Sequence, residues 1–259
     1  MPEDYSFRPY PRYLLRKKLI AEIVERQDVS EKTCLEIGYG HGDLLFYLGG
    51  RFRRAFGYDS SANAIEIVRR RLANNPNQSG KIEIITSSDG LARHSYDCIV
   101  ACEVLEHIRD DTSTLIFWRD LLNDDGILII SVPAHQKRWA SNDEVSGHFR
   151  RYEKDELTAK LQRTGFRLDT FWSYGYPLIT LLDYCLNRRA QSKLRDNFGT
   201  SQPELVTKEQ LTGKSFMGGD CRGDAFFSSN LVLFPFFFLQ KLFLNRDLSS
   251  AYLVAARKA

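Results

Sequence analysis

The stretch from Cys34 to Asp43 limits the fold of this chain most strongly. It begins as an apolar run typical of a buried strand and then carries glycine at every second position: Gly38, Gly40 and Gly42. A helical pattern of apolar residues follows at once, over 44–48. Strand, glycine turn and helix form the geometry in which a nucleotide-like ligand approaches the backbone at the carboxyl end of a parallel strand. Glycine suits this turn because it adopts unusual backbone angles and has no Cβ to block the ligand, although an ordinary tight turn would also use it.

The glycine spacing separates two classes of cofactor. A dinucleotide-binding turn follows the pattern G-x-G-x-x-G, and Asp43 stands where its third glycine should be. The pattern present is E-x-G-x-G-x-G, with Glu36 two residues before Gly38. At this point the chain resembles the class I S-adenosylmethionine (SAM)-dependent methyltransferases, whose first motif has that form. The resemblance implies SAM as the cofactor, bound by Glu36, Gly38, Gly40 and Gly42, and opposes an NAD-dependent dehydrogenase.

Two further acids follow predicted strands. Asp59 ends the second strand, where an acid can accept hydrogen bonds from both ribose hydroxyls, and Ser60 follows it in the predicted cofactor site. The third strand, 81–86, leads to Asp89-Gly90, and the resemblance implies that Asp89 binds the adenine amino group while a backbone N–H beside it reaches the ring. Asp at a strand end is often a turn or cap residue, so this simpler role is the alternative at both places.

The fourth strand, 96–102, runs into Glu103, Glu106 and His107. In a helical turn these three side chains share one face, because they stand at i, i+3 and i+4. The resemblance places the methyl donor at the carboxyl end of this strand, so we predict Glu103 as a cofactor contact. His107 and His148 are the candidates for a catalytic base, because the unperturbed pKa of histidine lies near working pH. A structural or substrate-orienting role is the alternative for both.

Residues 134–152 form a predicted loop rich in basic and aromatic side chains. The piece from Gly147 to Tyr152 resembles a segment common among small-molecule members of the family, and we predict Arg151 and Tyr152 as substrate contacts. A basic, aromatic loop suits a carboxylate or phosphate on the substrate. The alternative is that Arg150 and Arg151 pair with Asp143 or Glu144 on the surface.

Glu103, Glu106, His107 and His148 also resemble the E-x-x-E-H…H pattern of two metal-dependent groups. These are the ubiquinone-pathway O-methyltransferases and the small-RNA 2′-O-methyltransferases, and the resemblance implies a divalent ion held against the acceptor hydroxyl. The pattern is short and also occurs in relatives without evident metal, so we assign no metal from the sequence.

Alternating strands and helices over 33–133 predict a doubly wound, mostly parallel, Rossmann-like α/β sheet. The resemblance implies seven strands, the last of them, 250–257, antiparallel. A large insertion before this strand departs from the minimal fold of the family. We therefore predict three parts. Residues 1–30 form a helical segment covering the site, with Arg16 on a solvated face; 31–174 and 248–259 form the SAM-binding core; and 175–247 form an inserted substrate lid.

Net charge and cysteine content limit the kinds of partner and the cellular setting that we expect. A net charge of +3 is too small to indicate a nucleic-acid partner. Five cysteines without regular spacing do not indicate a disulfide framework, so we expect a reducing, cytoplasmic setting. The Phe-rich part of 226–244 is too short and too interrupted for a comfortable membrane span. It is either a packed lid or a peripheral lipid contact.

The sequence therefore predicts methyl transfer to an oxygen or nitrogen of a small, partly apolar, anionic molecule. One alternative is a metal-assisted O-methyltransferase acting on a quinone-like, lipid-like or RNA hydroxyl. A second alternative is a non-catalytic SAM-binding partner of another enzyme.

Overall fold

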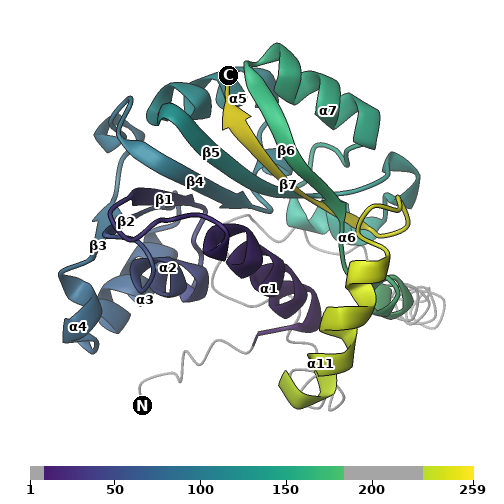
Figure 1. The fold of residues 1–259 in the computed structure, drawn as a ribbon, viewed down its shortest axis with the longest axis horizontal. Helices are drawn as coiled ribbons and strands as arrows, with labels where there is room; N and C mark the ends of the chain where they lie inside the picture. The colour runs from purple at the N-terminus through teal and green to yellow at the C-terminus, as the bar shows by residue number, and fades with distance from the viewer. Residues whose placement is uncertain (1–8, 184–229) are drawn as a thin grey trace, which may run out of the picture.

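A computed structural model of the chain describes residues 9–183 and 230–259 (Figure 1). The middle of the predicted insertion, 184–229, lies outside the described residues, so its assignment as a lid stays a prediction.

The centre of the fold is one seven-stranded sheet in the order β3-β2-β1-β4-β5-β7-β6. Its strands are β1 Thr33–Ile37, β2 Arg54–Tyr58, β3 Ile82–Ile85, β4 Tyr96–Cys102, β5 Leu122–Pro133, β6 Phe166–Ser173 and β7 Ala251–Lys258. The first five strands pair in parallel, and β7 runs antiparallel between β5 and β6. The predicted Rossmann-like sheet with an antiparallel last strand is confirmed.

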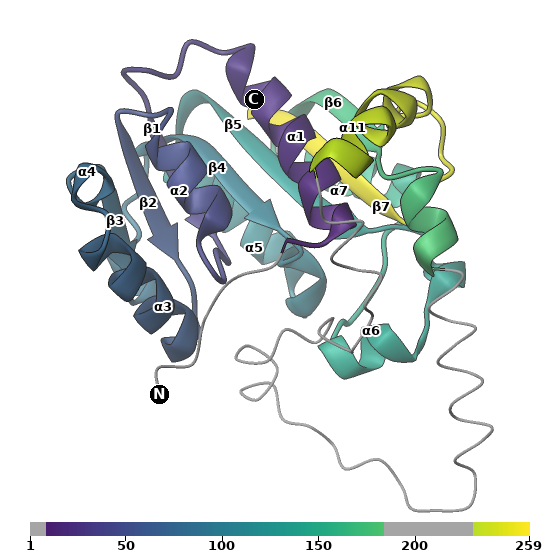
Figure 2. The same ribbon diagram turned by 90° about the horizontal axis from the view of Figure 1, so that it is seen from below.

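Helices cover both faces of this sheet (Figure 2). They are α1 Pro11–Glu25, α2 Asp43–Gly49, α3 Ala62–Ala73, α4 Pro76–Ser79, α5 Asp111–Leu121, α6 Ser141–Ser146, α7 Lys154–Arg163 and α11 Asn230–Leu239. The segment 134–152, predicted as a loop, thus contains the short helix α6. Successive strand residues point to opposite faces, so Cys34 packs with α1, α2 and α3 while Leu35 packs with α5 and α7. Both faces are apolar, as is typical of a parallel sheet between two helical layers.

Helix α1 serves two purposes along its length. Its second half carries Leu19, Ile20 and Ile23 into the core on one sheet face. Its first half brings Arg16 to Glu103, which follows β4, and Lys17 to Asp43, at the start of α2. The carboxyl edge of a doubly wound sheet is where ligands bind.

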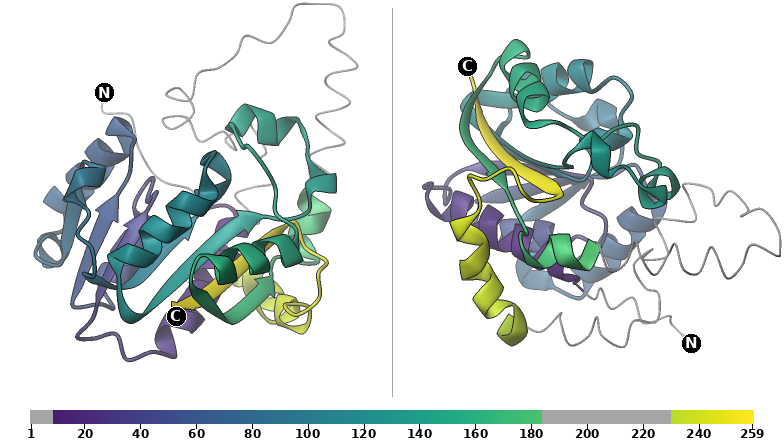
Figure 3. Two further views of the ribbon diagram at one scale, coloured as in Figure 1. Left: turned by 90° about the horizontal axis from the view of Figure 1, so that it is seen from above. Right: turned by 90° about the vertical axis from the view of Figure 1, so that its right-hand side faces the viewer.

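The described ends of the insertion pack on α1. Leu178, Ile179 and Leu233 form a small buried cluster with Leu15, and α11 packs beside one end of α1 (Figures 1 and 3). Among the described residues, no helix has the length and apolar character needed to cross a membrane.

Candidate functional site

The glycine turn lies between β1 and α2. Gly38, Gly40 and Gly42 have φ of 73°, 51° and 77°, in the left-handed region that favours glycine. A Cβ on Gly38 would come within 2.5 Å of the Val104 side chain, whereas a Cβ on Gly40 would have no atom within 4 Å. The turn is therefore open at Gly40, and its backbone is accessible to a ligand there.

Asp59 lies beside this turn. One carboxylate oxygen accepts a hydrogen bond from the N–H of Gly40 at 2.9 Å, and the other accepts one from the N–H of Ser61 at 2.9 Å. A carboxylate has about four lone-pair sites, so both oxygens keep capacity for ribose hydroxyls. Ser60, also predicted as a cofactor contact, is exposed next to Asp59.

Asp89 and Gly90 lie in a short 3-10 turn, Ser88–Gly90, which follows β3. Both residues are exposed. Because β3 pairs in parallel with β2, this turn opens at the same edge of the sheet as Asp59. The structure thus brings the three predicted strand-end segments to one edge.

Glu36 is buried beneath the glycine turn. Burial raises its pKa to about 8, against the opposing attraction of the Arg16 charge. One of its carboxylate oxygens has no hydrogen-bond partner among the described residues. Glu36 is therefore a buried carboxyl group, two residues before Gly38, that is easily kept neutral.

Arg16 corrects one sequence prediction. It was expected on a solvated face, yet it is only 6% exposed. Its guanidinium lies 3.0 Å from the Glu103 carboxylate and donates to the Ser131 hydroxyl at 3.1 Å. The physical reason is that the first half of α1 reaches past the sheet, so its polar side faces the site rather than water.

Glu103 is fixed by its contacts with Arg16 and Ser131. Its backbone has φ of 56°, and its carboxylate also accepts a hydrogen bond from Ser131 at 2.8 Å. Burial opposes ionisation, but the charges of Arg16 and Arg12 and the hydrogen bond from Ser131 together outweigh it and lower the pKa of Glu103. The predicted cofactor contact is thus an ionised carboxylate at the carboxyl end of β4.

Two side chains of α1 also bind the first residue of α2. The Asp43 carboxylate accepts hydrogen bonds from Tyr13 at 2.5 Å and from Lys17 at 2.6 Å. Burial opposes ionisation of Asp43, but these hydrogen bonds lower its pKa overall. The acid that replaces the third glycine of a dinucleotide turn therefore ties α1 to the predicted cofactor loop.

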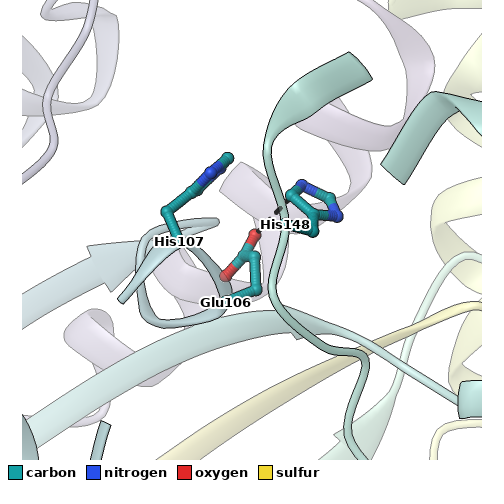
Figure 4. A group of neighbouring side chains, drawn as sticks. All are labelled: Glu106, His107 and His148. Atoms are coloured by element: carbon teal, nitrogen blue, oxygen red, sulfur yellow. Dashed lines mark ion pairs between the residues drawn. The ribbon is translucent and has the colours of Figure 1, made fainter. Parts of the chain in front are cut away.

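A second group of titratable side chains joins the segment after β4 to the segment after α6. Glu106, His107 and His148 each offer a ligand atom within 4.8 Å of the others (Figure 4). Nε2 of His148 lies 3.9 Å from a carboxylate oxygen of Glu106. The two imidazole rings stand edge to face, with centroids 4.7 Å apart. The two histidines predicted as candidate bases are therefore neighbours.

Glu106 is fully buried, and neither of its carboxylate oxygens accepts a hydrogen bond from another described residue. Burial, reinforced by the nearby charge of Glu103, raises the pKa of Glu106 well above its usual range. A buried carboxyl group in this state is neutral unless a cation approaches it.

Asp143 is the residue that the sequence placed wrongly. It was considered only as a surface partner of arginine, yet it is 0% exposed. It accepts hydrogen bonds from Nδ1 of His148 at 2.8 Å and from Nε of Arg151 at 2.9 Å. Burial opposes ionisation, but these bonds lower the pKa of Asp143. The available signal was Gly147, whose φ of 73° turns the chain back at the end of α6 and returns His148 to Asp143.

The predicted substrate contacts lie elsewhere than expected. Tyr152 is 0% exposed in the core and donates a hydrogen bond to Asp111 at 2.8 Å. Arg151 is held by Asp143, and Arg150 lies 2.7 Å from Asp111. We therefore leave Tyr152 out of the substrate site, and both arginines have acidic partners within the chain.

The four residues of the sequence-level metal pattern separate into two groups. Glu106, His107 and His148 converge, whereas Glu103 is engaged by Arg16 and Ser131. The structure thus offers a three-residue set in place of the four-residue set.

Comparison with known proteins assigns the family. A family model described as a methyltransferase domain matches residues 8–170. The ubiquinone biosynthesis O-methyltransferase of Glaesserella parasuis is 30% identical over 128 residues, which cover 47% of this chain and 54% of that protein. The enzyme of the same name from Nitrosomonas europaea is 30% identical over 118 residues, covering 45% and 49%. The chain thus spans about half the length of the curated relatives it matches.

Solved structures share the fold. The [4+2]-cyclase SpnF has a TM-score of 0.58 at 14% identity, covering 93% of this chain and 80% of that one. Phosphoethanolamine N-methyltransferase 2 of Haemonchus contortus, in complex with SAM, has a TM-score of 0.57 at 14% identity, covering 93% and 52%. The fold alone therefore does not select an acceptor. The family match covers most of the chain, including the glycine turn and Asp59, and the chain belongs to the class I SAM-dependent methyltransferases.

Proposed function

We propose that this methyltransferase transfers the methyl group of SAM to a hydroxyl oxygen of a small, partly apolar molecule, with His148 taking the hydroxyl proton. The observation that carries the proposal is the arrangement of Asp143, His148 and Glu106 at the segment that follows β4, the strand paired in parallel with β1. An aligned carboxylate–imidazole pair is the arrangement that general-base catalysis requires.

Methyl transfer from a sulfonium is an in-line displacement. The acceptor oxygen forms a bond to the methyl carbon while the carbon–sulfur bond breaks, and neutral S-adenosylhomocysteine leaves. Because the acceptor hydroxyl must lose its proton, a base beside the oxygen accelerates the step. Positioning of the two reactants supplies much of the remaining rate enhancement.

The hydrogen bonds around His148 define its part in this step. Ionised Asp143 accepts the Nδ1–H of the imidazole, which leaves the lone pair on Nε2 directed toward Glu106 and the space beside it. Glu106, whose pKa is raised, stays protonated and does not hold a competing negative charge. His148 is thus the proposed base, Asp143 its positioning residue, and His107 a neighbour that helps to shape the acceptor site.

The relatives support an oxygen acceptor, because those named above are O-methyltransferases, although at 30% identity over about half of their length. The proposal does not require an anionic group on the acceptor. Arg150 and Arg151, which suggested such a group, lie against Asp111 and Asp143.

The test measures transfer of labelled methyl from SAM to a panel of phenols and catechols with alkyl or isoprenoid substituents, beside a panel of amines. We expect label in the hydroxyl panel, reduced about 10²-fold or more by His148→Gln, as for loss of a general base. His94→Gln, which changes an exposed histidine, is the matched control and should keep wild-type activity. Label in the amines alone, or full activity of His148→Gln, would overturn the proposal.

A second candidate is a metal-assisted form of the same reaction. The residues fit a divalent ion, because Glu106 is a buried carboxyl without a hydrogen bond from another described residue and lies within ligand distance of both histidines. Glu106, His107 and His148 would hold the ion, with Asp143 orienting His148 as a carboxylate behind a ligand. A bound divalent ion lowers the pKa of a hydroxyl that contacts it.

The two candidates differ in their response to chelation. For the metal-assisted form, chelator-treated protein should lose turnover and recover it with added Mg²⁺, Mn²⁺ or Zn²⁺, and His107→Ala should lower the metal content of the protein. Full activity of protein proved metal-free by elemental analysis would remove the second candidate and leave the first.

A further inference from the structure

Helix α11 and the turn that follows it carry an exposed apolar stripe. Phe234, Phe238 and Leu242 are 58%, 57% and 73% exposed. They stand four residues apart, so they lie on one side of the helix. The rings of Phe234 and Phe238 contact each other edge to face, with centroids 5.1 Å apart. Grouped apolar side chains of this size mark an interaction surface more often than scattered ones do.

The other side of α11 is already packed. Leu233 is fully buried against Leu15 and Leu178. Just past the helix, the side-chain oxygen of Gln240, also buried, accepts a hydrogen bond from the N–H of Gly175 at 3.2 Å. These contacts fix the packed side of α11 and leave the side chains of the stripe exposed.

Charge around the stripe favours one kind of partner. From 230 to 246 the chain contains no acidic residue, and its charged residues are Lys241 and Arg246, both exposed. Lys241 pairs with Glu22 of α1 at 2.7 Å. Lys18, also exposed, stands four residues before Glu22 and so lies on the same side of α1. Phenyl rings flanked by cations match an anionic lipid surface, where the rings enter the interface and the cations meet the headgroups.

We propose that Phe234, Phe238 and Leu242 insert into the interface of an anionic lipid bilayer, with Lys241 and Arg246 at the level of the headgroups. The helix lies on the surface, because its ten residues are about half of what a spanning helix needs. The docking does not depend on the identity of the methyl acceptor. It brings α1, and with it the polar side chains that α1 contributes to the SAM site, close to the membrane surface.

The test is flotation of the full chain with vesicles of phosphatidylcholine, with and without phosphatidylglycerol. The double variant Phe234→Ser/Phe238→Ser should lower binding by roughly tenfold or more, because it removes two phenyl groups from the interface. The control Ile116→Ser changes a side chain that is 39% exposed on α5 and should leave binding unchanged. Arg246→Gln should lower binding about fivefold, and only to vesicles that contain phosphatidylglycerol.

Each other outcome overturns the proposal. Wild-type protein that stays unbound at low salt excludes a lipid surface. A concentration-dependent dimer that the double variant abolishes, without vesicle binding, assigns the stripe to contact between two copies. Equal loss in Ile116→Ser shows that binding does not depend on this stripe. Folding of each variant is verified by thermal unfolding and SAM binding, and Leu242→Ser replaces the double variant if the latter does not fold.

Discussion

Asp143 accepts a hydrogen bond from Nδ1 of His148 at 2.8 Å, inside the protein and five residues away along the chain. This bond fixes which imidazole nitrogen faces Glu106. Arg151 binds the same carboxylate, and the hydrogen bonds from His148 and Arg151 lower the pKa of Asp143. The orientation of the proposed base therefore depends on a residue that needs no contact with either substrate.

Asp143→Asn should lower kcat by about 10²–10⁴-fold and leave the KM for SAM within about twofold, because the amide does not stabilise the required tautomer and charge. The pH dependence of kcat should change as well, which a purely structural role would not cause. Steady-state kinetics across pH, below the measured unfolding temperature, check this. Glu144→Gln changes the exposed neighbouring acid and should behave like the wild type. An unaltered kcat and pH profile for Asp143→Asn would end the positioning role.

Asp59→Ala should weaken SAM binding by about 1.5–3 kcal/mol, the range for a hydrogen bond to a charged group. The variant also loses the bonds from the N–H groups of Gly40 and Ser61, so part of the loss comes from a less ordered turn. Calorimetric titration with SAM measures the effect. Glu66→Ala, at an exposed acid on the adjoining α3, should leave affinity unchanged. Equal affinities for wild type and Asp59→Ala would exclude Asp59 from the site.

Arg16→Met should destabilise the chain by about 3–5 kcal/mol, because it leaves the Glu103 carboxylate in a buried place without its cation. Adding Glu103→Gln should recover much of that loss, since the uncompensated charge is then gone. Urea unfolding of both single variants and the double variant gives the coupling energy. Lys18→Ala, at an exposed position on α1, should stay within about 0.5 kcal/mol. Additive losses would mean that the pair is not coupled.

Glu36 makes stability depend on pH. Its pKa rises from an ordinary 4.5 to about 8 on folding, so the folded chain binds this proton more tightly. The resulting stabilisation is complete below pH 4.5 and is lost as pH rises through about 8. Glu36→Gln should therefore unfold with a free energy similar to wild type near pH 4.5. Above pH 8 it should be more stable by about 5 kcal/mol, at 1.36 kcal/mol for each of the roughly 3.5 pH units between the two pKa values.

Denaturant unfolding at acid, neutral and alkaline pH measures the difference between Glu36→Gln and wild type. Glu31→Gln, at an exposed acid before β1, should show no such trend. A difference that does not grow with pH would show that Glu36 ionises as freely in the folded chain as in the unfolded one.

The sequence by itself determined the sheet and the cofactor. Short apolar runs that end in turn residues predict buried parallel strands, and only glycine adopts the three left-handed turn positions easily, so the fold and the SAM loop follow from local pattern. The predicted strands 81–86, 96–102 and 250–257 agree within one residue at each end with Ile82–Ile85, Tyr96–Cys102 and Ala251–Lys258. The segments carrying Asp59 and Asp89 also came to the same edge because parallel strands end there.

Tertiary structure alone decided which charged groups meet. Nothing local to α1 indicates that Arg16 faces Glu103, because that contact depends on where the helix crosses the sheet. Arg151 and Tyr152 looked like substrate contacts by type, yet their partners, Asp143 and Asp111, are set by the packing of α6, α5 and α7. Burial removes water as a competing partner, so a charged side chain takes whichever opposite charge the fold brings near. The hydrophobic periodicity of the sequence therefore does not predict which charged residues form pairs.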